Sequence, residues 1–92
     1  MIRTFRHKGL ELFFTKSDVR RIPAERAARI GRLLDRLEAC PRPLDMKLPG
    51  FGWHALKGSR KGTYAVEVSG NWRLTFKFAG EDAIDVDLED YH

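Results

Sequence analysis

The chain has 92 residues, of which 42% are hydrophobic and 33% are charged, and these proportions are typical of one small folded domain rather than a disordered segment. No apolar run approaches the roughly 18 residues that span a membrane, and the basic N-terminus MIRTFRHKG lacks the apolar stretch of a signal peptide. The single Cys40 excludes an internal disulfide framework and a multi-cysteine zinc site. We therefore expect one cytoplasmic domain that spans residues 1–92.

The basic residues are concentrated in the first part of the chain. The sequence carries 17 Lys and Arg against 13 Asp and Glu, a net charge of +4. All 17 basic residues lie within residues 1–78, whereas six of the 13 acidic residues follow Phe78. A basic body closed by an acidic strand predicts a polyanionic partner such as nucleic acid. The alternative is a solvated basic surface whose charge the acidic strand compensates.

The first half of the chain is predicted to be mainly helical. Residues 2–5 alternate like a strand, and residues 8–15 form a short apolar helix. The clearest helix begins at Pro23, which suits a first helical position, and ends near Cys40, because Pro41 disfavours helical geometry in the residue before it. Its apolar face repeats at helical spacing through Ala27, Ile30, Leu34 and Leu37.

A second face of this helix carries Arg29, Arg32 and Arg36, again three and four residues apart. The functional interpretation is a positive stripe that contacts RNA or ribosomal phosphates and adds salt-sensitive, sequence-independent affinity. The alternative is a solvated face with ion pairs such as one between Glu25 and Arg29.

The second half is predicted to be a sheet. A proline- and glycine-rich loop over 41–52 has apolar side chains that should pack on the core. Strands are predicted over 53–57, 64–68, 72–78 and 83–92, and a basic turn between the first two supplies Arg60 and Lys61. In the 72–78 strand the alternation points the aromatic side chains and Leu74 toward the helices. The opposite, polar face then receives Arg73, Thr75 and Lys77, with Glu67 from the preceding strand. We expect Arg60, Lys61 and Lys77 to contact RNA or the ribosome.

The final strand ends on three titratable residues, Asp90, Tyr91 and His92. Its apolar residues Ile84, Val86 and Leu88 alternate with acids, so that these three should face the core together. Asp90 and His92 share the parity of Leu88. The strand must therefore end or bend after Leu88 if these two residues work in a cleft, and otherwise the site is expected to rely on Tyr91 and Arg73.

These groups fit the cleavage of RNA by attack of a ribose 2′-hydroxyl on the adjacent phosphate. That reaction needs a base, an acid and cations that stabilise the phosphate. His54, His92 and Asp90 are candidates for proton transfer or for orienting an imidazole. Lys57 and Arg73 are candidates for phosphate stabilisation, and Tyr91 for a hydrogen bond or base stacking.

Simpler roles are possible for the same residues. His54 and Lys57 are three apart, which puts them on opposite faces of a regular strand unless the chain bends. The alternatives are a structural His54, a solvated Lys57 and a frayed chain end. His7, His54, Asp90 and His92 have no recognised metal-binding spacing, and no cofactor motif is visible, so we expect neither a metal nor a cofactor.

The motifs in their order resemble one protein family. They are FRHKGLELFF at 5–14, HALKG at 54–58, NWRLTFKF at 71–78 and the terminal EDYH at 89–92. This combination resembles the HigB toxins, the plasmid-maintenance "killer protein" branch of the RelE/ParE toxin superfamily, from one end of the chain to the other.

The resemblance implies an α+β, microbial RNase-like fold, with an N-terminal strand and two helices on one face of a mainly antiparallel sheet of four or five strands. It implies a type II toxin that cleaves mRNA in the decoding site of the 70S ribosome, without a metal and away from membranes. The expected partner is a HigA-like helix-turn-helix antitoxin, through which the complex would bind operator DNA. The active-site residues carried over are His54, Lys57, Arg73, Asp90, Tyr91 and His92. The competing class is a non-catalytic binder of the same fold, either a gyrase poison or an RNA-binding module.

Overall fold

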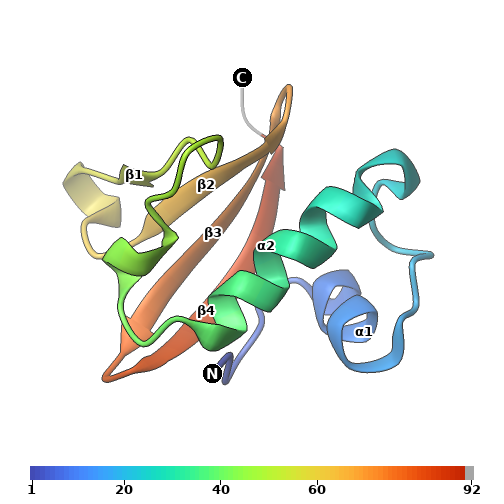
Figure 1. The fold of residues 1–92 in the computed structure, drawn as a ribbon, viewed down its shortest axis with the longest axis horizontal. Coiled ribbons are helices and arrows are strands. Elements are labelled where there is room, and N and C mark those ends of the chain that lie inside the picture. Colours follow the sequence, from blue (N-terminus) through green and yellow to red (C-terminus); the bar gives the residue numbers. More distant parts are fainter. Residues whose placement is uncertain (91–92) are drawn as a thin grey trace.

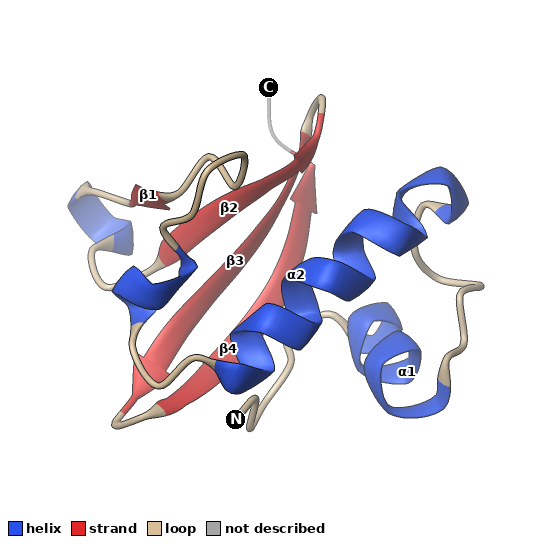
Figure 2. Cartoon of the chain, viewed as in Figure 1, coloured by secondary structure: helices blue, strands red, loops and turns tan. Residues whose placement is uncertain are grey.

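Two helices pack with a four-stranded antiparallel sheet in the computed structural model, which describes residues 1–90 (Figures 1 and 2). The sheet order is β1-β2-β3-β4, so strands that are neighbours in the sequence are also neighbours in space. The predicted α+β class is confirmed. The helices are α1 (Lys8–Lys16) and α2 (Ala27–Ala39), and the strands are β1 (His54–Ala55), β2 (Tyr64–Ser69), β3 (Trp72–Ala79) and β4 (Asp82–Asp90).

The N-terminal segment lies along the outer edge of β4 and runs parallel to it. Ile2 and Phe5 form isolated bridges with Ala83 and Val86. The Arg3 amide donates to the Ala83 carbonyl at 2.8 Å. The predicted strand over 2–5 is therefore a bridged edge segment rather than a regular strand. Its pairing covers the edge of β4, which would otherwise expose unpaired backbone groups.

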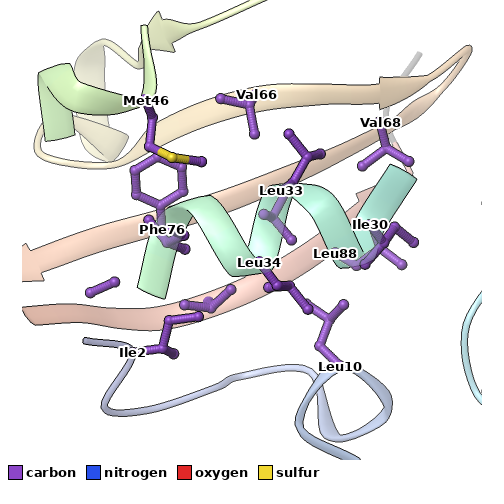
Figure 3. Packing of buried hydrophobic residues seen from close by; sticks show 14 of the residues in the cluster. Ile2, Leu10, Ile30, Leu33, Leu34, Met46, Val66, Val68, Phe76 and Leu88 are labelled. Atoms are coloured by element: carbon purple, nitrogen blue, oxygen red, sulfur yellow. The ribbon is translucent and has the colours of Figure 1, made fainter. Parts of the chain in front are cut away.

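The core lies between α2 and the sheet, as Figure 3 shows. The predicted apolar face of the helix is confirmed, since Ile30, Leu34 and Leu37 are almost completely buried. The loop before β1 contributes Met46, which is completely buried, whereas Leu44 is 62% exposed. The prediction that the apolar loop residues pack on the core is thus right for Met46 and wrong for Leu44. No helix within residues 1–90 is long and apolar enough to cross a membrane.

A β-bulge in β4 changes which residues of this strand face the core. Thr75 pairs with Asp87 but Lys77 pairs with Ile84, so β4 contains one residue more than β3 over this interval. Asp85 adopts a left-handed φ of 52° at the bulge. An extra residue reverses the parity of a strand. Ile84 therefore shares a face with Lys77, and the prediction that it faces the core together with Val86 and Leu88 is wrong.

Two helical glycines are expected to respond in opposite ways to alanine. A Cβ at Gly9 would lie 2.7 Å from both the Cβ and the carbonyl oxygen of Arg21, whereas one at Gly31 would first meet Phe13 Cζ at 3.5 Å. Gly9→Ala should destabilise the fold because backbone must move. Gly31→Ala should raise the free energy of unfolding by about 0.5–1 kcal/mol. Urea unfolding of both variants checks this, and equal effects would contradict the packing at Gly9.

Candidate active site

Strand register arranges polar side chains in rows on the face of the sheet that is opposite to α2. Residues directly opposite each other in antiparallel strands share a face. The pairings His54↔Ala65, Ala65↔Thr75 and Thr75↔Asp87 form one row, and Glu67↔Arg73 and Arg73↔Glu89 form the next. We call this surface the polar face. It brings His54 and Arg73 into neighbouring rows, and the predicted orientation of Arg73, Thr75, Lys77 and Glu67 away from the core is confirmed.

Glu89 is the centre of a hydrogen-bonded cluster on the polar face. Its Oε1 accepts bonds from Arg60 Nη1 at 2.8 Å and Arg73 Nη2 at 3.2 Å, and its Oε2 accepts from Arg60 Nη2 at 2.5 Å and Thr75 Oγ1 at 2.8 Å. The bidentate contact with Arg60 is the strongest type of carboxylate pairing. The cluster fixes the position of Arg73, and the hydrogen bonds from Arg60, followed by those from Thr75 and Arg73, lower the pKa of Glu89 to about 2.

No role for Glu89 was predicted from the sequence. The signal was present, because Glu89 differs in parity from Leu88 and belongs to the EDYH motif. The sequence alone does not give the strand register, which places Glu89 opposite Arg73.

This cluster predicts acid sensitivity. The pKa of Glu89 falls from 4.5 to about 2 on folding, so its contribution to stability is complete above pH 4.5 and is lost as the pH falls toward 2. The free energy of unfolding should therefore decline with acidification more steeply in the wild type than in Glu89→Gln. Asp18 has a similarly low pKa beside Arg20 and is common to both proteins. Denaturant unfolding between pH 5 and about 2.5 measures the difference, and parallel curves would contradict it.

A polar hollow of about 190 Å³ adjoins the cluster. Three cations and one carboxylate border it, together with hydroxyl groups from the turn and the sheet. This composition suits a phosphodiester, because its oxygens accept hydrogen bonds and its negative charge is attracted to cations. Arg60 and Lys77, both predicted to contact RNA, meet here, whereas Arg6 was not predicted. The lining residues are Arg6, Ser59, Arg60, Thr63, Thr75, Lys77 and Asp85.

The end of β4 lacks the predicted bend as far as Asp90. Pairing is regular from Thr75↔Asp87 to Trp72↔Asp90. By parity, Asp90 therefore lies on the side of Trp72 and Leu88 and not with Arg73, and its side chain is exposed where the strand ends. This regular pairing is the case in which the sequence-based prediction relied on Tyr91 and Arg73. Tyr91 and His92 lie outside the described residues.

Lys57 is placed on the other side of β1 from His54. The strand is only two residues long, and the chain is then held by a bond from the Leu56 amide to the Thr63 carbonyl at 2.9 Å. Lys57 and Lys61 line a hollow with Ala55 and Tyr64, and Tyr64 packs against the core. The bend that would bring Lys57 to the face of His54 is therefore not formed.

Comparison with known proteins decides the family. The sequence model described as "RelE-like toxin of type II toxin-antitoxin system HigB" matches residues 3–92. The chain belongs to the HigB-like toxin family. It is also 37% identical to the Endoribonuclease HigB of Proteus vulgaris over 92 residues, which cover the whole of both chains. The resemblance that the motifs indicated is thus confirmed for this HigB-like toxin.

The predicted arginine stripe does not lie on the polar face of the HigB-like toxin. Arg29 donates from Nη2 to the carbonyl oxygens of Gly50 and Glu67, at 2.7 and 2.9 Å, and its guanidinium lies 5.5 Å from the ring centre of Phe51. It therefore ties α2 to the loop and to β2. Arg32 and Arg36 are exposed on α2, which covers the opposite face of the sheet.

His7, considered for a metal site, has a structural role instead. Its Nδ1 accepts a bond from the Leu10 amide at 3.1 Å and caps the N-terminus of α1. Such a bond satisfies one of the amides that a helix start leaves without a partner. Within residues 1–90, no three His, Cys, Asp or Glu side chains are grouped to hold a metal ion.

Proposed function

We propose that this HigB-like toxin is a ribosome-dependent mRNA endonuclease that cuts in the decoding site by attack of a 2′-hydroxyl on the adjacent phosphate. The observation that carries the proposal is the polar face, where His54 lies one row from Arg73 and where Thr75, in the row of His54, lines a cationic hollow. The family supports it, since the Proteus vulgaris relative is an endoribonuclease.

The polar face and the terminal residues 90–92 together supply groups for each part of the reaction. His54 supplies an exposed imidazole, the side chain most often used for proton transfer, and His92 is the second imidazole. Arg73 is oriented by its bond with Glu89 and acts on the crowded phosphate. Arg6 and Lys77 hold the neighbouring backbone phosphate in the hollow. Tyr91 stacks on a base or donates a hydrogen bond, and Asp90 orients an imidazole at the end of β4.

Membership of the family supports a proposal for the partners. A type II toxin is neutralised by a protein antitoxin, and for this chain we propose a HigA-like antitoxin with a helix-turn-helix. Contact with operator DNA is then made through the toxin–antitoxin complex. The substrate is mRNA held by the 70S ribosome.

Deletion of the last three residues separates a nuclease from a non-catalytic binder. Leu88 is the last described residue of the core cluster, so removing residues 90–92 should leave the fold intact. The nuclease should lose at least about 10²-fold in cleavage, the typical contribution of one general acid or base. The measurement is the rate of mRNA cleavage on ribosomes, with circular dichroism as the control for folding. A folded deletion variant with full cleavage activity would remove the terminal residues from the site.

A further inference from the structure

The β1 edge of the sheet carries two adjoining apolar hollows that the proposed chemistry does not use. One of about 410 Å³ is lined by Ala55, Leu56, Lys57, Gly58, Lys61, Gly62 and Tyr64. The other, of about 310 Å³, is lined by Arg42, Pro43, Leu44, Trp53 and Tyr64. Tyr64 belongs to both hollows, and we call the two hollows together the edge groove.

Fixed aromatic rings form the floor of the edge groove. Trp53 and Tyr64 are stacked with ring centres 5.7 Å apart, and Tyr64 in turn stacks against Phe76 of the core at 6.1 Å. The indole Nε1 of Trp53 donates to the Pro43 carbonyl at 3.1 Å. Contacts of this kind hold the rings in place before a ligand arrives. Ordered aromatic and apolar surfaces are what proteins offer to unstacked nucleobases.

The rim of the groove is positively charged. Lys57 and Lys61 are exposed, and within residues 1–90 neither forms an ion pair. Lys47 adds a third charge 5.5 Å from the Trp53 ring centre. The fourth cation, Arg42, is paired with Asp45 at 3.2 Å. An apolar floor with a cationic rim complements bases attached to phosphates, and a neutral apolar partner would leave these charges unused.

The turn next to Lys57 and Lys61 leaves room for an RNA strand to approach. Gly58 and Gly62 both have left-handed φ values, of 66° and 95°. A Cβ at either position would meet no atom within 4 Å. Both glycines line the groove, so the backbone there is open to a ligand rather than covered by the protein.

We propose that the edge groove binds single-stranded RNA next to the nucleotide that is cleaved. Bases contact Tyr64 and Leu44, and Lys57 and Lys61 pair with the backbone phosphates. His54 and Ala55 are consecutive residues of β1 that face opposite sides of the sheet. RNA that crosses this edge therefore passes from the groove to His54. Lys57 becomes a substrate-binding residue and not a catalytic one, an assignment that rests on the proposed function.

The test measures the affinity of a fluorescently labelled single-stranded RNA of about twelve nucleotides at several salt concentrations. The parent protein is His54→Ala, which should not cleave the probe. Each phosphate contact to single-stranded RNA contributes about 0.7 to the slope of log K against log salt. Lys57→Ala/Lys61→Ala should therefore flatten the slope by about 1.4. The matched control removes two exposed lysines of α1, in Lys8→Ala/Lys16→Ala, and should keep the parent slope.

The outcomes for the groove and for the proposed function are distinct. An unchanged slope in Lys57→Ala/Lys61→Ala, or no binding by the parent, overturns the RNA groove, and so does loss of antitoxin binding alone in this variant. Cleavage on ribosomes by the otherwise wild-type protein is measured separately. If the probe binds as expected but wild type does not cut mRNA on ribosomes, the groove stands and the nuclease proposal fails. If wild type and the lysine variant cut with the same KM, the nuclease stands and the groove fails.

Discussion

Replacing His54 with alanine is expected to reduce ribosome-dependent mRNA cleavage by roughly 10²- to 10⁴-fold, the usual contribution of one general acid or base. His54 is exposed on the polar face, one row from Arg73. The substitution removes an imidazole without opening a cavity, so the free energy of unfolding should change by less than about 0.5 kcal/mol. Single-turnover cleavage of mRNA on programmed ribosomes gives the rate, and urea unfolding gives the stability.

A second histidine provides the matched control for this prediction. His7 lies at the start of α1 and caps the helix through Nδ1. His7→Asn keeps a preferred capping residue and should leave cleavage unchanged. Equal loss of cleavage in His7→Asn and His54→Ala would indicate a general defect, and full activity of His54→Ala would exclude His54 from proton transfer.

The largest expected loss of stability comes from Glu89→Ala. The substitution leaves Arg73, whose side chain is only 18% exposed, without its bond to Oε1, and the buried Thr75 hydroxyl without its acceptor. Removing one partner from a partly buried charged cluster costs more stability than the intact cluster contributes. The reason is that the remaining charged and polar groups stay desolvated without their hydrogen bonds. We expect a loss of about 2–3 kcal/mol in the free energy of unfolding, measured by urea denaturation at pH 7.

An exposed ion pair serves as the reference for Glu89→Ala. Glu11 pairs with Lys8 at 3.3 Å, and its side chain is 44% exposed. Surface pairs of this type typically contribute about 0.5 kcal/mol or less, so Glu11→Ala should change stability little. Similar losses in the two variants would show that the cluster around Glu89 does not stabilise the fold as described.

The elements of this fold could be predicted from the sequence because their signals are local. The 3, 4, 3 spacing from Ala27 to Leu37 records the buried face of α2, and Pro41 marks where the helix must end. The alternation over residues 72–78 likewise records the two faces of β3. A local sequence pattern does not reveal a β-bulge. The prediction of which face of the sheet Ile84 occupies was therefore wrong.

The site was harder to predict because it depends on register and on long-range contacts. Arg29 has the spacing of a surface stripe, but its side chain bonds to carbonyls 21 and 38 residues away in the chain. The convergence of Arg60 and Arg73 on Glu89 spans separations of 29 and 16 residues. Lys57 was predicted to belong to the catalytic set, and it lines the edge groove, on the other side of the two-residue strand β1 from His54. Motifs supplied the candidate residues, whereas the strand register determined which of them share a face of the sheet.

Primer extension on one mRNA, with and without ribosomes, tests the central claim most directly. The protein is added to the free transcript and to the same transcript held on ribosomes with a defined codon in the decoding site. We expect strand breaks within that codon for the wild type on ribosomes, none on free mRNA, and none above background for His54→Ala. Absence of wild-type breaks on ribosomes, or breaks of equal intensity on free and ribosome-bound mRNA, would contradict a ribosome-dependent nuclease on the polar face.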